Sequence, residues 1–336
     1  MNLEKYEDTI RSKKENQKEQ FSSFCDFRFV KSTITPGVTF AIRVLKPASP
    51  SYIKAGTHGW HMSIFNFQNY DEPQSDYLEV EVDMRGRAFS TGKPDCNGYE
   101  LYDIYDAINF VKKEYRQYII SDEVMYFESG SGGGGNALAI AGKFPDLFSA
   151  INAFTPISDY YEWYKFDEKV GEFRDEMDIW ISPSPDENRT AYDSRSGITM
   201  IENLLTSLFI CHGTSDERVP YFLSEMYLKR AAELKKGDKV KLHTLHNVGT
   251  QDHYGNITKE QMSAFLKSAR DNLDMNRTPI AIPKKGSFVV CGYLVTKAFS
   301  VFLSSIDVVT VVHYDTKSKT AFLDNMEIEH KIIWHN

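Results

Sequence analysis

Predicted strands and helices alternate through most of this chain, and no other feature limits its possible folds as strongly. Short apolar runs that suit buried strands are each followed by a segment with apolar residues at helical spacing. The strand-like runs are 77–82, 124–127, 148–154, 208–211 and 239–245, and the helical segments are 99–115, 136–143, 221–235 and 258–273. Such alternation predicts a mostly parallel sheet covered by helices on both faces, with a hairpin over 27–47 before it.

Three segments depart from this rhythm. Residues 1–22 are polar and predict an N-terminal arm with little apolar surface to bury. Residues 157–200 lie between two predicted strands and are rich in aromatic side chains, which is typical of a lid inserted over a site. Residues 284–336 consist of β-rich runs separated by hairpin-like gaps and predict a small antiparallel β module. The alternating domain itself is expected to span 23–278.

Composition excludes several classes of partner. The net charge is −8 and no basic cluster stands out, so we expect no nucleic-acid partner. The four cysteines are far apart, without metal-binding spacing, which predicts free thiols in a reducing compartment. The start lacks the apolar core of a signal peptide and no apolar run is long enough to span a membrane, so a cytoplasmic protein is expected.

The turn between the strand 124–127 and the following helix carries Ser131 within the string Ser129-Gly130-Ser131-Gly132-Gly133. A sharp strand-to-helix turn with small neighbours presents a serine hydroxyl above the sheet as a nucleophile. Two other interpretations stay open. The glycines 130–135 also satisfy the GxGxxG fingerprint of a dinucleotide loop, although no acidic residue ends the next strand to hold a ribose. The string could also be a glycine-rich turn without chemistry.

A serine nucleophile needs a base, an acid and oxyanion donors, and later loops offer candidates in the right order. Asp216 follows the strand 208–211, and His253 lies in the loop after the next strand, with His246 as the reserve base. The N–H of Gly132 would face the oxyanion. The turn His58-Gly59-Trp60-His61 follows an earlier strand, so the N–H of Trp60 is the predicted second donor.

At this point the chain resembles a known family. The run Asp83-Met84-Arg85-Gly86-Arg87-Ala88-Phe89-Ser90-Thr91-Gly92 is similar to the DxRGxGxSxG segment of the cocaine-esterase and X-prolyl dipeptidyl peptidase branch of α/β-hydrolases. Prolyl oligopeptidase-like and acetyl xylan esterase-like relatives carry similar segments. The resemblance covers about 37–273 and implies an α/β-hydrolase fold with a Ser131–Asp216–His253 triad. The chain departs from the family pattern at Ser129 and Ala88, where glycines are usual, and in the longer loop around His253.

We therefore expect a serine carboxylesterase or acetyl esterase that needs no cofactor or metal and acts on a small ester or an acylated glycan. The predicted substrate-binding side chains are Tyr161, Trp163 and Tyr164 in the insertion. A prolyl-type peptidase is the first alternative, and it would use acidic residues such as Glu162, Asp167 and Glu168 to grip a substrate amine. The second alternative is a non-catalytic binding protein. The β module could form a homo-oligomer.

Overall fold

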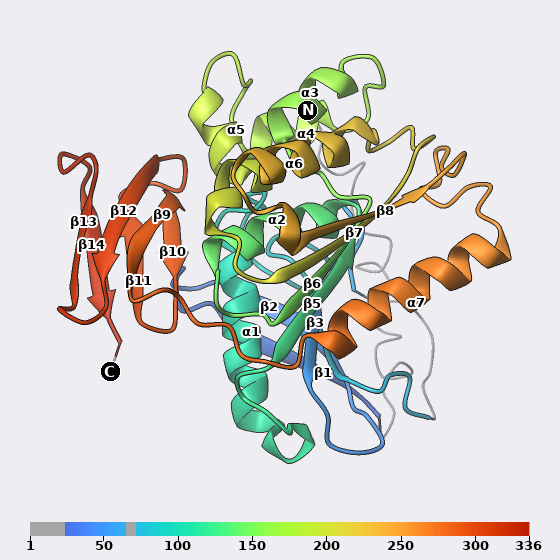
Figure 1. Cartoon of the computed structure of the whole chain (residues 1–336), viewed down its shortest axis with the longest axis horizontal. Coiled ribbons are helices and arrows are strands. Elements are labelled where there is room, and N and C mark those ends of the chain that lie inside the picture. Colours follow the sequence, from blue (N-terminus) through green and yellow to red (C-terminus); the bar gives the residue numbers. More distant parts are fainter. Residues whose placement is uncertain (1–23, 65–71, 336) are drawn as a thin grey trace.

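The computed structural model describes residues 24–64 and 72–335, so the predicted N-terminal arm 1–22 lies outside the described residues. An eight-stranded sheet forms the centre (Figure 1), with the strand order β1-β2-β4-β3-β5-β6-β7-β8. Its strands are β1 (Cys25–Lys31), β2 (Thr39–Leu45), β3 (Ile53–Gly56), β4 (Leu78–Val82), β5 (Met125–Gly130), β6 (Ala150–Phe154), β7 (Ser207–Gly213) and β8 (Val240–Leu245). Strands β3 to β8 run parallel, whereas β2 is antiparallel to both β1 and β4. The predicted hairpin and mostly parallel sheet are confirmed.

Helices cover both faces of the sheet, as the alternation predicted. On one face lie α1 (Glu100–Glu114), α2 (Gly132–Lys143) and α6 (Phe222–Glu233), and on the other lies α7 (Lys259–Met275). Successive residues of β7 point to opposite faces of the sheet and so belong to different hydrophobic cores. Leu208 and Ile210 join the core beneath α1, α2 and α6, whereas Phe209 and Cys211 pack beneath α7. Helix α2 begins at Gly132 rather than at the predicted Asn136, so four consecutive glycines are helical.

The insertion forms three short helices and a 3-10 turn above the ends of the parallel strands. These are α3 (Tyr160–Asp167), α4 (Arg174–Trp180), α5 (Arg189–Arg195) and η4 (Gly197–Asn203), and Figure 1 shows the three helices together at one end of the molecule. Asp167 was predicted as part of an acidic grip for a substrate amine. Its buried carboxylate instead accepts hydrogen bonds from the backbone N–H groups of Glu172, Phe173 and Arg174, so it fixes the entry into α4.

The C-terminal strands form a second, antiparallel sheet at the side of the molecule (Figure 1), ordered β13-β12-β9-β10-β11-β14. They are β9 (Lys285–Cys291), β10 (Tyr293–Val295), β11 (Phe299–Leu303), β12 (Val309–Asp315), β13 (Thr320–Leu323) and β14 (His330–Trp334). One face carries Val289, Cys291 and Tyr293 into the main core, and the other holds a separate cluster around Phe288 and Phe299. The predicted β module is present.

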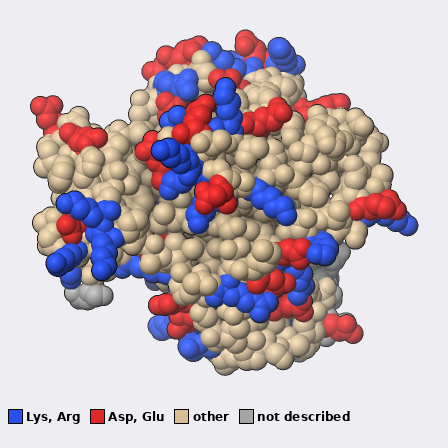
Figure 2. All heavy atoms as spheres, viewed as in Figure 1, with Lys and Arg blue, Asp and Glu red and all other residues tan. Residues whose placement is uncertain are grey.

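Acidic and basic side chains are interspersed over the face of the molecule seen in Figure 2, without a patch of one sign. No helix within 24–64 and 72–335 is long and apolar enough to cross a membrane.

Candidate active site

Ser131 lies at the tip of the turn that joins β5 to α2, in a backbone conformation that side chains rarely adopt. Its φ is 58° and its ψ is −122°. The Ser131 N–H donates to the Phe154 carbonyl on the neighbouring strand at 2.9 Å, and its own carbonyl accepts from the Gly135 N–H in the first turn of α2 at 3.1 Å. The turn therefore places the hydroxyl at the carboxyl edge of the sheet, beside the partial positive charge of a helix N-terminus.

Ser129, which departs from the usual glycine, is accommodated by a glycine that follows the nucleophile. A Cβ on Gly133 would lie only 2.0 Å from the Ser129 Oγ, so position 133 must stay without a side chain. The Ser129 hydroxyl donates to the Thr57 carbonyl at 2.9 Å and accepts from the Thr57 N–H at 3.3 Å. The extra hydroxyl thus ties the turn to the loop after β3.

The structure brings Ser131, His253 and Asp216 into one hydrogen-bonded chain. The Ser131 Oγ lies 2.8 Å from the His253 Nε2, and the His253 Nδ1 lies 2.6 Å from the Asp216 Oδ2. The other oxygen of Asp216 accepts from the backbone N–H groups of Arg218 and Val219, which holds the carboxylate in place. His246, the reserve base, is exposed on the surface instead.

The two predicted oxyanion donors belong to backbone segments in close contact. A Cβ on Gly132 would lie 2.7 Å from the Trp60 backbone nitrogen, so the Trp60 backbone packs directly against the residue that follows the serine. The loop that carries Trp60 is held by His58, whose Nδ1–H donates to the Gly59 carbonyl at 2.8 Å while Nε2 accepts from the Met84 N–H at 3.1 Å. Burial, helped by the charge of Arg87, lowers the pKa of His58 to about 3 and keeps it neutral.

The DxRG segment (residues 83–86) supports the loop that carries Trp60. Arg85 is buried and makes a bidentate ion pair with Asp103 on α1, both nitrogens lying 2.7 Å from a carboxylate oxygen. Asp83 accepts hydrogen bonds from the Ser90 hydroxyl and the Phe89 N–H, which closes the turn after β4. These contacts make the segment a scaffold for the site.

The aromatic residues predicted to bind substrate do not line the cavity beside the oxyanion donors. Trp163 and Tyr164 are buried in the core of the insertion, where the Trp163 indole donates to the Arg218 carbonyl at 2.9 Å. Tyr161 is covered by the Arg189 guanidinium, 3.7 Å from its ring centroid. A cavity of about 30 Å³ beside the oxyanion donors is lined instead by Tyr160 and Trp180 together with Trp60 and Gly132. Spacing in a short insertion does not reveal which helix face turns inward, and the substrate-binding role of these three residues stays a prediction.

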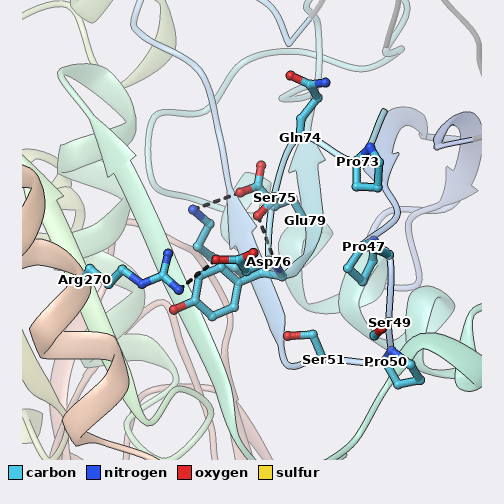
Figure 3. Close-up of a pocket in the computed structure, with 13 residues that line it drawn as sticks. Pro47, Ser49, Pro50, Ser51, Pro73, Gln74, Ser75, Asp76, Glu79 and Arg270 are labelled. Atoms are coloured by element: carbon cyan, nitrogen blue, oxygen red, sulfur yellow. Dashed lines mark hydrogen bonds and ion pairs between the residues drawn. The ribbon is translucent and has the colours of Figure 1, made fainter. Parts of the chain in front are cut away.

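Another cavity, of about 700 Å³, lies at the opposite edge of the sheet (Figure 3). Its lining comes from the segments before β3 and β4, the first residues of these strands and α7, whereas Ser131 follows the carboxyl end of the parallel strand β5. Its charged side chains are paired, Lys54 with Glu79 at 2.9 Å and Arg270 with Asp76 at 2.7 Å. This cavity is therefore separate from the serine.

The glycines of the string allow α2 to pack closely. Cβ atoms on Gly134 and Gly135 would lie 2.6 Å from the Phe154 carbonyl oxygen and 2.5 Å from the Tyr160 hydroxyl. Close packing of α2 against β6 and α3 therefore accounts for these two glycines without a bound dinucleotide. The residues within 24–64 and 72–335 include no group of three or more histidines, cysteines or carboxylates arranged to hold a metal.

The sheet order, the nucleophile turn and the loops around it define an α/β-hydrolase. The sequence profile of the prolyl oligopeptidase family matches residues 74–272, more than half of the chain. The chain belongs to this family of serine hydrolases, which confirms the resemblance predicted from its motifs. None of the curated proteins compared by sequence matches the chain.

Solved structures share the fold at low sequence identity. Acylaminoacyl peptidase from Pyrococcus horikoshii superposes with a TM-score of 0.62 at 17% identity over 77% of this chain and 42% of the peptidase. A puromycin-hydrolysing peptidase from Mycobacterium tuberculosis gives 0.63 at 16% over 76% of this chain and 40% of its own. An esterase from Pyrococcus furiosus gives 0.56 at 12% over 76% of this chain and 92% of its own. The chain thus spans about two fifths of these peptidases.

Proposed function

We propose that the protein hydrolyses carboxylic esters through an acyl-enzyme formed on Ser131. The observation that carries the proposal is the hydrogen-bonded chain from Ser131 to His253 at 2.8 Å and from His253 to Asp216 at 2.6 Å. In this order His253 takes the hydroxyl proton as Ser131 attacks the ester carbonyl, and Asp216 stabilises the imidazolium that forms.

The remaining steps use the same groups. The negative charge on the tetrahedral intermediate is stabilised by the N–H groups of Gly132 and Trp60. The intermediate collapses as the bond to the leaving alkoxide breaks, and His253 returns its proton to release the alcohol. A water molecule, deprotonated by His253, then attacks the acyl-enzyme, and the carboxylic acid leaves as Ser131 recovers its proton.

The small cavity beside the oxyanion donors favours a short acyl group. Its volume is about 30 Å³. Its lining includes Gly132 and Trp60 but not Ser131, and one water molecule needs roughly 10–15 Å³ measured in the same way, so there is little room for a long acyl chain on this side of the oxyanion donors. We propose an acetyl ester, of a small molecule or a glycan, as the first substrate to test.

Amide or peptide hydrolysis is the second candidate, and family membership favours it. The family is that of prolyl oligopeptidase, and the structural neighbours include an acylaminoacyl peptidase and a puromycin-hydrolysing peptidase. The chemistry is the same, except that His253 must protonate a leaving amine rather than an alkoxide.

Labelling with a fluorophosphonate tests the nucleophile. We expect the probe to label the wild-type protein and Ser263→Ala, a matched control because Ser263 is exposed on α7, but not Ser131→Ala. Labelling that survives in Ser131→Ala would refute the assignment, and a wild-type protein without labelling would favour a non-catalytic binding role.

A substrate panel then separates the two hydrolytic functions. Nitrophenyl acetate, butyrate and octanoate report on ester hydrolysis and acyl length, and aminoacyl-coumarin amides report on peptidase activity. We expect the highest kcat/KM for acetate. A preference for an aminoacyl amide over every ester would replace the first candidate by the second.

A further inference from the structure

Helix α4 of the insertion carries a carboxylate that is fully buried against the oxyanion loop. The Glu176 side chain is 0% exposed, and its Oε2 accepts a hydrogen bond from the Trp60 indole Nε1 at 2.6 Å. The same oxygen lies 2.7 Å from the His61 Nε2. Its other oxygen, Oε1, is buried without a hydrogen-bond partner among the residues that the structure describes. Burying a carboxylate in this way is costly, so the arrangement calls for a functional reason.

The same helix restrains Trp60 at further points. Trp180, one turn after Glu176, lies with its ring centroid 4.8 Å from that of Trp60. The Arg87 guanidinium lies 4.1 Å from the Trp180 ring centroid and donates to the Trp60 carbonyl at 2.6 Å. The indole N–H, the indole ring and the carbonyl of Trp60 are therefore each held, directly or through Arg87, by α4.

These restraints act on a residue whose backbone nitrogen packs against Gly132, the residue that follows the nucleophile. A donor stabilises an oxyanion best when it is aimed at the developing charge before the reaction begins, because no energy is then needed to reorient it. A Trp60 whose side chain and carbonyl are fixed has little freedom to turn its N–H away.

We propose that Glu176 is a positioning residue that keeps the Trp60 N–H aimed at the oxyanion. The inference rests on the proposed hydrolytic function and deepens it, since it makes the insertion part of the transition-state machinery as well as a cover. Residues 60 and 176 are far apart in sequence, so the lid helix and the oxyanion loop must come together for the second donor to be fixed.

Two substitutions at Glu176 separate positioning from folding. Glu176→Leu fills the site with an apolar side chain of similar size but leaves the buried Trp60 indole N–H without its acceptor, so we expect it to lower Tm. In the folded protein we expect its kcat for nitrophenyl acetate to fall roughly tenfold to hundredfold, somewhat less than removal of a donor costs, with little change in KM. Glu176→Gln keeps a carbonyl oxygen for the indole and should retain kcat to within about threefold.

Trp60→Phe supplies the second arm of the experiment. It removes the indole N–H but keeps an aromatic ring and the backbone donor, so it should lower kcat about as much as Glu176→Leu. The double variant should be no worse than either single one, because both break the same interaction. Asp178→Asn is the matched control on α4, since Asp178 bonds Tyr164 rather than Trp60, and it should keep the wild-type kcat.

Affinity for an aryl trifluoromethyl ketone, which forms a tetrahedral oxyanion on a reactive serine, provides an independent readout. We expect this affinity to fall in parallel with kcat in Glu176→Leu and to recover in Glu176→Gln. Wild-type kcat and ketone affinity in Glu176→Leu would overturn the positioning role while leaving the hydrolase intact. Activity that survives in Ser131→Ala would instead overturn the proposed function itself.

Discussion

At the scale of single residues, the site depends on one backbone conformation that the surrounding structure enforces. Ser131 has a φ of 58°, which is unfavourable for a residue with a Cβ. The Ser131 N–H donates to the Phe154 carbonyl on β6, and α2 begins at the next residue. The backbone on both sides of Ser131 is therefore held in place. The same backbone conformation that is unfavourable for Ser131 therefore also places its hydroxyl at the site.

Replacing Ser131 by glycine should separate this strain from the chemistry. Glycine adopts a positive φ readily, so we expect Ser131→Gly to be inactive but more stable to urea than Ser131→Ala by about 1 kcal/mol. Alanine is the matched control, because it also lacks the hydroxyl but keeps the Cβ. Equal stabilities of the two variants would show that the turn is not strained.

His212, at the end of β7, is buried next to the acid loop. Its Nε2–H donates to the Val219 carbonyl at 2.8 Å, and its Nδ1 faces the Ser224 hydroxyl at 2.7 Å. Burial lowers the pKa of His212 from 6.5 to about 4, although Asp216 partly opposes the shift. The neutral ring is therefore the form that supports the loop.

This pKa predicts a stability that depends on pH. Between pH 6.5 and about 4 the unfolded chain protonates His212 while the folded chain does not, so the folded state loses stability as the pH falls through this range. We expect His212→Gln to remove about 3 kcal/mol of this loss, measured as the difference in unfolding free energy between variant and wild type at pH 7 and pH 4. A difference that stays constant with pH would contradict the assignment.

At the scale of elements, α2 shows how close packing can outweigh helix propensity. Gly142, near its end, lies against η4, and a Cβ there would be 2.4 Å from the Met200 Cβ. At the start of the helix, Gly134 lies similarly close to the Phe154 carbonyl oxygen of β6, and Gly135 to the Tyr160 hydroxyl of the insertion. This proximity explains why a central helix contains so many residues that disfavour helices.

Gly142→Ala tests which effect is larger. Alanine would gain about 1 kcal/mol of helix propensity, but the contact with Met200 involves atoms close to the backbone and forces the two elements apart. We expect a net loss of roughly 1–2 kcal/mol in unfolding free energy. Gly237→Ala is the control, because its nearest contact would be an ordinary 3.5 Å, and it should stay near the wild-type value.

At the scale of the whole molecule, the C-terminal sheet is joined to the hydrolase domain by a shared core (Figure 1). Asn203 forms a polar bridge between them, since its side chain donates to the carbonyls of Gly142 and Val289 and accepts from the Val289 N–H. Lys143 at the end of α2 is fully buried, donates to the Cys291 carbonyl and lies 4.6 Å from the Tyr293 ring centroid. Separating the sheet would leave these polar groups unpaired.

We therefore predict that both parts unfold in one transition. Three tryptophans lie in or next to the insertion and the fourth, Trp334, lies in β14, so fluorescence of the wild type and of Trp334→Phe reports on the two parts separately. The urea midpoints should coincide with each other and with that of far-UV circular dichroism. A separate early transition of Trp334 would show that the sheet is an independent domain. That the C-terminal sheet forms a homo-oligomer stays a prediction.

Local patterns in the sequence were sufficient to predict the order of strands and helices in this protein. Apolar periodicity depends only on neighbours along the chain, so it predicted the alternating strands and helices and the C-terminal β strands. Ser131, Asp216 and His253 could be picked out because the loops after parallel strands meet at one edge of a sheet. The structure brings these three together, and their catalytic roles remain the proposal to test.

Only the tertiary structure decided what happens between distant segments. It placed His253 rather than His246 on the serine, and it turned Tyr160 and Trp180 instead of Tyr161, Trp163 and Tyr164 toward the cavity. The bond from Glu176 to Trp60 crosses 116 residues and has no local pattern in the sequence. The geometry around Ser131 depends on contacts of this kind, which form only when the insertion has packed.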